Sequence, residues 1–199
     1  MFIMVGSSSF DIDKRLVFYE GKHVILKVLT KEDVDLSGWV GWLNDEANCK
    51  TNGHHLYPVS FRSQYDFLEN ISNKSNKLQL GIVNKNISSD LCGVISLDNI
   101  NLVHRNADLS VLNSVADTSQ YPYVFMESWS ILLKHAFEQF GLYKINVGTF
   151  HPRISVAIQR LFNFKVEGIR KQQIFKDNIY HDVHLLAVFR DEVTYPEIL

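Results

Sequence analysis

The sequence predicts a single α/β (α+β) domain with a central mixed, mostly antiparallel sheet of about seven strands, flanked by helices. The chain has 199 residues, which suits one domain. β-rich runs and helical stripes follow in the order strand, two helices, three strands, helix, strand, helix, two strands. No linker divides them, so we expect residues 16–199 to form the domain and residues 1–15 a flexible leader.

The first third of the chain is predicted to hold one strand and two helices. Residues 23–29 form a β-rich run, which predicts the first strand. Thr30 stands where a helix N-cap belongs, before two acidic residues, so a helix is expected to continue past Trp42. Residues 44–58 are expected to be irregular, and Ser60 to cap a second helix with an apolar stripe at helical spacing.

Three strands are then expected near residues 78–83, 91–99 and 106–112. In the last of them apolar and polar side chains alternate, which places Asp108 and Ser110 on the face opposite the apolar one.

The remaining elements begin with a helix, because residues 129–140 carry a strong helical stripe and Gly141 supplies its stop. After it we expect a strand at 144–150, a helix at 154–162, and strands near 164–175 and 180–190 joined by a turn at 176–178.

Composition excludes several classes of function. With 20 basic and 22 acidic residues the net charge is −2, so no global field draws the chain to nucleic acid or to an anionic membrane. Cys49 and Cys92 have no metal-ligand spacing, so no metal site or disulfide framework is expected, and a reducing cytoplasm fits best. No run approaches 18 apolar residues, and no GxSxG, HExxH or P-loop motif is present.

Several sequence segments resemble those of the GNAT acyltransferase superfamily in their order and spacing. The resemblance is to its branch of ribosomal-protein N-terminal and amino-sugar acetyltransferases in particular. The segments are Gly93–Leu97 followed by His104–Leu109, Leu132–Phe137 followed by Phe140–Leu142, and Phe164–Gly168 followed by Lys176–Asp182. The resemblance implies an N-acetyltransferase that uses acetyl-CoA as acyl donor. It implies as acceptor a primary amine, on a small molecule such as an amino-sugar nucleotide or on a protein N-terminus, and it allows a homodimer.

The resemblance also implies where acetyl-CoA binds. It places the pantetheine arm where the strands at 106–112 and 144–150 splay apart, and the pyrophosphate on the amides that open the central helix. The residues that it assigns to the coenzyme are Leu109, Ser110, Val111, Gln120, Tyr121, Tyr123, Val124, Phe125 and Thr149.

The coenzyme loop departs from the family pattern of Arg/Gln-x-x-Gly-x-Gly/Ala. Only Gln120 agrees; Pro122 has no N–H, while Tyr123 and Phe125 bring bulk where small residues let the backbone approach phosphate. We therefore expect weak or displaced coenzyme binding. The alternative reading is a catalytically inactive GNAT-fold binding or interaction module.

Three residues are candidates for catalysis. Asp108 matches a strand carboxylate that takes a proton from the acceptor amine. Ser155, in the first turn of a helix, lies near where relatives protonate the leaving thiolate. His54 belongs to a loop that frames the acceptor site in relatives and titrates near neutrality. Each also has a plain structural interpretation: solvated strand Asp, helix cap, surface His.

The same loop supplies two candidate substrate-binding residues, His55 and Asn52. The family's usual general acid, a Tyr, is matched by Gln159, and an Asn that usually follows the fifth strand is matched by Pro152. His184 is interpreted as structural.

Overall fold

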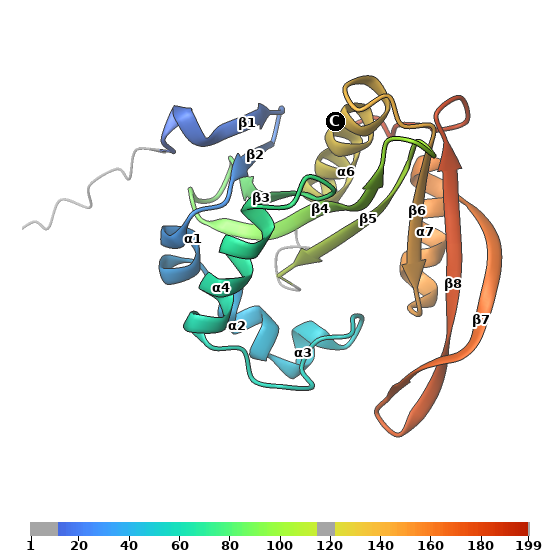
Figure 1. Ribbon diagram of the computed structural model, residues 1–199, viewed down its shortest axis with the longest axis horizontal. Helices are drawn as coiled ribbons and strands as arrows, with labels where there is room; N and C mark the ends of the chain where they lie inside the picture. The colour runs from blue at the N-terminus through green and yellow to red at the C-terminus, as the bar shows by residue number, and fades with distance from the viewer. Residues whose placement is uncertain (1–11, 115–121, 199) are drawn as a thin grey trace, which may run out of the picture.

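The computed structural model describes residues 12–114 and 122–198, which form an eight-stranded sheet in the order β1-β2-β3-β4-β5-β6-β8-β7 (Figure 1). The strands are β1 Val17–Glu20, β2 Val24–Val28, β3 Leu78–Asn84, β4 Leu91–Asn101, β5 Asn106–Asn113, β6 Lys144–Thr149, β7 Lys165–Lys176 and β8 Ile179–Phe189. Neighbouring strands are antiparallel except β5 and β6, which are parallel. The fold class that the sequence predicts is confirmed, with one strand more than expected.

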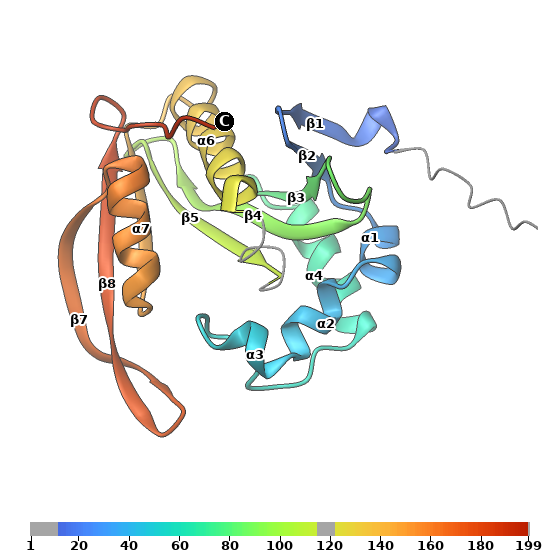
Figure 2. The same ribbon diagram turned by 180° about the vertical axis from the view of Figure 1, so that it is seen from behind.

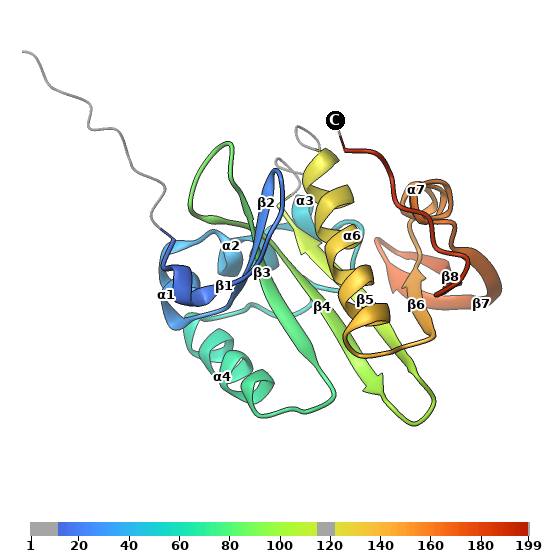
Figure 3. The ribbon, with the colours of Figure 1, turned by 90° about the horizontal axis from the view of Figure 1, so that it is seen from above.

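Helices cover both faces of the sheet. They are the 3₁₀-helix η1 Lys14–Leu16, and the α-helices α1 Lys31–Leu36, α2 Trp39–Asn44, α3 Glu46–Cys49, α4 Phe61–Ser72, α6 Pro122–Glu138 and α7 Pro152–Phe162. Figure 3 shows α6 lying across the middle strands, and Figure 2 shows α7 against the sheet beside β8.

Two hydrophobic cores lie on opposite faces because successive strand residues point to opposite sides. In β2, Val24 and Leu26 pack with α6 and α7 around Trp129 and Phe162. Ile25, between them, packs with α1, α2 and α4 around Trp39. The second core is the smaller one, and it borders the cavity described below.

Local signals account for several element boundaries. Thr30 and Asp33 form a capping box at the start of α1, and Ser60 caps α4, both as predicted. The turn between β7 and β8 has positive φ at Asp177 and Asn178, which is the geometry of a two-residue type I′ hairpin. Gly141 adopts φ +64° just beyond α6, as expected of a helix stop.

Three expectations were wrong in detail. The helix expected from Thr30 past Trp42 is broken into α1 and α2, because Ser37 is extended and its hydroxyl accepts from the Trp39 amide. The stretch 44–58, expected to be irregular, begins with α3, which is capped by the Asp45 side chain. The additional strand is β1, which pairs antiparallel with β2.

The expected leader falls largely on residues 1–11, which lie outside the described residues. Within its last residues, Asp13 caps the start of η1. In the part of the chain that the structure describes, no helix is long and apolar enough to cross a membrane.

Candidate functional site

A V-shaped gap opens between β5 and β6. The two strands pair in parallel only at Asn106–Lys144, Ala107–Ile145 and Asp108–Asn146. Beyond Asp108 they diverge, so the β6-facing edge of β5 from residue 109 to 113 has no partner strand among the described residues (Figure 1). Unpaired strand backbone presents alternating N–H and C=O groups, which suit a ligand that carries amides.

Two buried polar atoms on the chain that bounds this gap have no hydrogen-bonding partner. They are Asn113 Oδ1, at the end of β5, and His151 Nδ1, two residues after the end of β6. Buried polar atoms are rarely left unsatisfied. A polar ligand seated in the gap would satisfy His151 Nδ1, whereas Asn113 Oδ1 lies against Gly93 of β4, on the side of β5 away from β6. Thr149, which the resemblance assigns to the coenzyme, is the last residue of β6 and accepts from the His151 amide at 3.1 Å.

The first turn of α6 carries three of the other assigned residues. Val124 is 4% exposed in the core, Phe125 packs against Trp129 at 4.9 Å between ring centroids, and Tyr123 packs against His23 at 4.8 Å. These bulky side chains are thus turned into the fold. Pro122 is the first residue of α6 and offers no N–H. Gln120 and Tyr121 lie outside the described residues.

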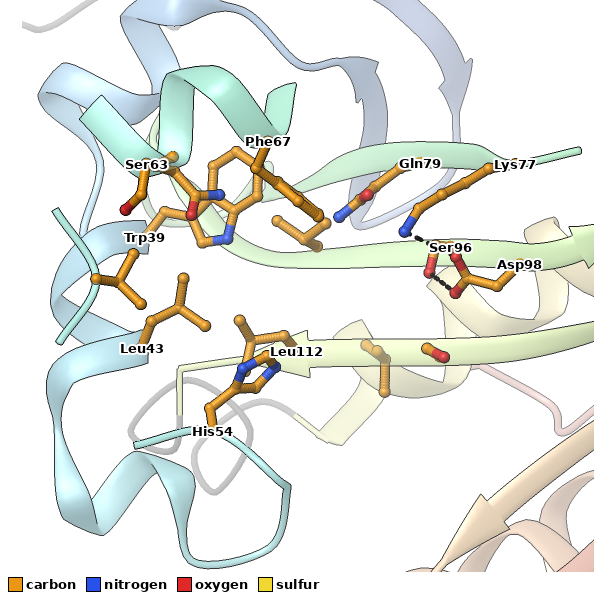
Figure 4. A pocket seen from close by; sticks show the side chains of 15 residues that line it. Trp39, Leu43, His54, Ser63, Phe67, Lys77, Gln79, Ser96, Asp98 and Leu112 are labelled. Carbon is orange, nitrogen blue, oxygen red and sulfur yellow. Dashed lines mark hydrogen bonds and ion pairs between the residues drawn. The ribbon is translucent and has the colours of Figure 1, made fainter. Parts of the chain in front are cut away.

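A cavity of about 430 Å³ adjoins the diverging part of β5, on the sheet face that α2 and α4 cover (Figure 4). Of the residues assigned to the coenzyme, Ser110 and Val111 line it, whereas Leu109 is buried on the opposite face. The described residues that line the cavity are Trp39, Leu43, His54, Val59, Ser63, Gln64, Phe67, Lys77, Gln79, Val94, Ser96, Asp98, Ser110, Val111 and Leu112.

Strand register builds the polar floor of this cavity. Gln79 pairs with Ser96, and Ser96 with Ser110, so three polar side chains form a row across β3, β4 and β5 on one face. One row further along, Asp98 pairs with Asp108 on the same face. Sequence reasoning missed Gln79, Ser96 and Asp98, although their alternation with buried apolar residues in β3 and β4 was a usable signal.

The charged pair in the cavity is internally satisfied. Lys77 Nζ lies 2.8 Å from Asp98 Oδ1, and the Ser96 hydroxyl donates to Asp98 Oδ2 at 2.7 Å. Both carboxylate oxygens therefore have a donor. The Lys77 ammonium also lies 5.3 Å from the centroid of the Phe67 ring.

His54 enters the cavity from the loop after α3, next to Leu112 (Figure 4). Desolvation first, and then the nearby Lys176 ammonium, lower the pKa of His54 below its usual value. The imidazole is consequently neutral at neutral pH and can accept a proton.

The other two loop candidates lie elsewhere. His55 is exposed, as His54 is, and both border a second cavity of about 400 Å³ beside the β7–β8 turn, but His55 does not line the first cavity. The Asn52 side chain accepts from the His54 amide at 2.9 Å, and its carbonyl accepts from Lys176 Nζ, also at 2.9 Å. Asn52 thus holds the loop in place and joins it to the hairpin tip.

Asp108 sits at the point where β5 and β6 part. Its carboxylate accepts from Asn99 Nδ2 at 2.8 Å and from Asn146 Nδ2 at 3.3 Å. It is not among the described residues that line the 430 Å³ cavity.

Ser155 lies on the other side of the gap, 2% exposed in α7. Its hydroxyl is 3.1 Å from His184 Nδ1 and 3.2 Å from Gln159 Nε2. His184 pairs across strands with Thr149, so this cluster flanks the end of β6. The sequence analysis interpreted His184 as structural and did not place it beside Ser155, because their contact is made only by tertiary packing.

Asp108 thus lies at the apex of the gap, His54 in the adjoining cavity, and Ser155 in α7 beside the end of β6. No hydrogen bond joins any two of them in the described part of the chain. Over the same residues, no group of three or more His, Cys, Asp and Glu side chains could hold a metal ion.

No family model matches the sequence, and no curated protein matches it. Solved structures do. Spermidine N-acetyltransferase from Vibrio cholerae, solved with CoA and spermine, has a TM-score of 0.76 at 16% identity over 86% of this chain and 98% of its own. A protein described as a probable acetyltransferase gives 0.74 at 17% identity, over 86% and 96% of the two chains. At these identities the likeness concerns the fold: the chain has the GNAT acetyltransferase fold.

Proposed function

We propose that this protein is an N-acetyltransferase that transfers an acetyl group from acetyl-CoA to a primary amine. One observation carries the proposal: β5 and β6 are parallel neighbours that pair only as far as Asp108 and Asn146 and then open beside a cavity. Acetyl-CoA would supply an activated acetyl thioester. The unpaired edge of β5 from residue 109 to 113 would hold its pantetheine arm.

The residues around the gap suit the two proton transfers that such a reaction needs. A primary amine must lose a proton to become nucleophilic. His54, neutral and in the cavity, is the base that we favour, and Asp108 at the apex of the gap is the second candidate. Ser155, backed by His184, would hold the proton for the leaving sulfur.

The acceptor in this proposal is a small amine, such as an amino-sugar nucleotide, or a protein N-terminus. We propose no metal cofactor, nucleic-acid partner or membrane partner for the protein. A homodimer is the assembly that we expect. Cys49 and Cys92 are both buried. The compartment that we expect is the reducing cytoplasm.

The start of α6 favours a second candidate, a GNAT-fold binding module without catalysis. Pro122 opens the helix without an N–H, which weakens the usual seat for a pyrophosphate. Calorimetric titration with acetyl-CoA, together with a CoA-release assay over a panel of primary amines, separates the two. Binding with CoA release supports the enzyme. Absence of both, in a protein that unfolds cooperatively, supports the module.

A further inference from the structure

The cavity contains two amide side chains whose buried atoms lack partners. Gln64, on α4, is 4% exposed and its Nε2 has no hydrogen-bond acceptor; Gln79, on β3, has an Oε1 without a donor. Both residues line the 430 Å³ cavity, one from the covering helix and one from the sheet. Leaving such atoms unpaired costs stability, so an unpaired donor and an unpaired acceptor on two side chains that line one cavity point to a ligand that pairs with both.

The walls between these amides are apolar. Trp39 and Phe67 meet edge to face at 6.3 Å between ring centroids, with Leu43 and Leu112 on adjoining elements (Figure 4). Gln79 ends between the Phe67 ring and the Lys77 ammonium in the same view. Pockets of this size with apolar walls and a few placed polar groups bind small organic ligands.

The charges of the cavity disfavour a polycationic ligand. Lys77 and Asp98 are the charged side chains among its described lining residues, and they neutralise each other at 2.8 Å. The second oxygen of Asp98 is taken by Ser96. A second or third ammonium of a polyamine would lose its water here without gaining a carboxylate of its own.

We infer that the acceptor is a monoamine with an apolar, uncharged body that carries an amide group, seated between Gln64 and Gln79. This inference rests on the proposed function, since it names the acceptor class of that reaction. Gln64 Nε2 would donate to the amide carbonyl, and Gln79 Oε1 would accept from the amide N–H. The amine would lie toward Ser110 and His54, where the cavity meets the unpaired edge of β5.

The test measures binding of three probes by calorimetry: phenylalaninamide, phenethylamine, which lacks the carboxamide, and spermidine. Wild-type protein is expected to bind phenylalaninamide about tenfold or more tightly than phenethylamine. Spermidine is expected to bind more weakly than phenylalaninamide. A protein that binds spermidine more tightly overturns the inference.

Because the two aromatic amines differ in basicity, the decisive quantity is the change in the ratio of their affinities on substitution. Gln64→Met and Gln79→Met keep length and remove the amide. Each is expected to lower the ratio, and the double variant to bring it within about threefold of unity. Gln139→Met, on the exposed surface after α6, is the matched control and should keep the wild-type ratio. An unchanged ratio in a double variant that unfolds cooperatively overturns the inference.

If the double variant does not fold, the change of the affinity ratio in the single variants Gln64→Met and Gln79→Met decides. Turnover with acetyl-CoA, measured on the same samples, tests the proposed function separately. If binding depends on the amide but no amine causes CoA to be released from acetyl-CoA, the result counts against the proposed enzyme and not against the ligand class. CoA release with spermidine preferred counts against the ligand class alone.

A peptide beginning with phenylalanine provides the last arm. If this peptide binds more tightly than phenylalaninamide, a peptide N-terminus is the source of the amide. Weaker binding identifies a small amino amide. Both outcomes support the inferred ligand class. If neither the peptide nor phenylalaninamide binds more tightly than phenethylamine, the inference is overturned.

Discussion

The Ser155 hydroxyl lies 3.1 Å from Nδ1 of His184, which joins α7 to β8 beside the end of β6. Gln159 donates to the same hydroxyl at 3.2 Å. A hydroxyl has one proton to give and two lone pairs, so these two contacts fix the orientation of the buried Ser155 hydroxyl.

Ser155→Ala should therefore lower kcat by ~10²-fold with little change in the KM for either substrate, because a proton donor to the leaving group acts mainly in the transition state. His184→Gln should lower kcat less. The matched control is Ser130→Ala, since Ser130 is buried in α6 and bonds the Met126 carbonyl at 2.7 Å, away from the gap. Full turnover in Ser155→Ala would reduce the residue to a structural role.

The pH dependence of kcat/KM should report on His54. Its pKa is lowered, so the neutral, proton-accepting form predominates above a pH that lies below about 6.5. Activity should rise with pH through that value, and His54→Gln should remove this acidic limb and lower kcat/KM. His104→Gln, in the exposed turn after β4, should leave the profile unchanged. An acidic limb that survives in His54→Gln excludes His54 as the base.

Asp108→Asn tests the other candidate base. If Asp108 takes the proton, the variant should lose ~10²–10⁴-fold in turnover with little change in coenzyme affinity. If Asp108 only anchors the apex of the gap through Asn99 and Asn146, the loss should be small and accompanied by reduced thermal stability. Measuring kcat and the unfolding midpoint on one preparation distinguishes the two roles.

Coenzyme affinity should be limited by Pro122. We expect acetyl-CoA to bind more weakly than in the low-micromolar range. Pro122→Ala should tighten it at least tenfold, because it restores one N–H in the first turn of α6 and a charge-assisted bond contributes roughly 1.5–3 kcal/mol. Pro152→Ala, at the start of α7, is the comparison and should change affinity little. Low-micromolar or tighter binding of acetyl-CoA by the wild type would show that the N-terminus of α6 binds the coenzyme well despite Pro122.

Glu127 should be essential for stability rather than for chemistry. Its carboxylate, 6% exposed in α6, accepts from the backbone amides of Lys22, His23 and Val24 at 2.5, 2.8 and 3.0 Å. Glu127→Ala leaves these donors unpaired and should lower the free energy of unfolding by about 3 kcal/mol or more in denaturant titration. Glu138→Ala, exposed on the same helix, should cost less than about 0.5 kcal/mol. Similar values for both would contradict the assignment.

Much of the fold could be predicted because its signals are local. The caps at Thr30 and Ser60, the turn at Asp177–Asn178 and the alternation in β5 depend on a few neighbouring residues, and the structure has them where the sequence placed them. Errors arose where a local signal was weak: the single Ser37–Gly38 break in an otherwise helical pattern, and the four-residue strand β1.

The sequence by itself determined the order of elements and the likeness to one fold, and with it the expectation that β5 and β6 splay. The tertiary structure alone decided which side chains share the cavity. Gln64, Gln79 and Asp98 come from a helix and two strands, and they meet because strand register and the packing of α4 on the sheet bring them together. Register and packing are set by contacts between residues far apart in the chain, so no periodicity in the sequence encodes this meeting directly.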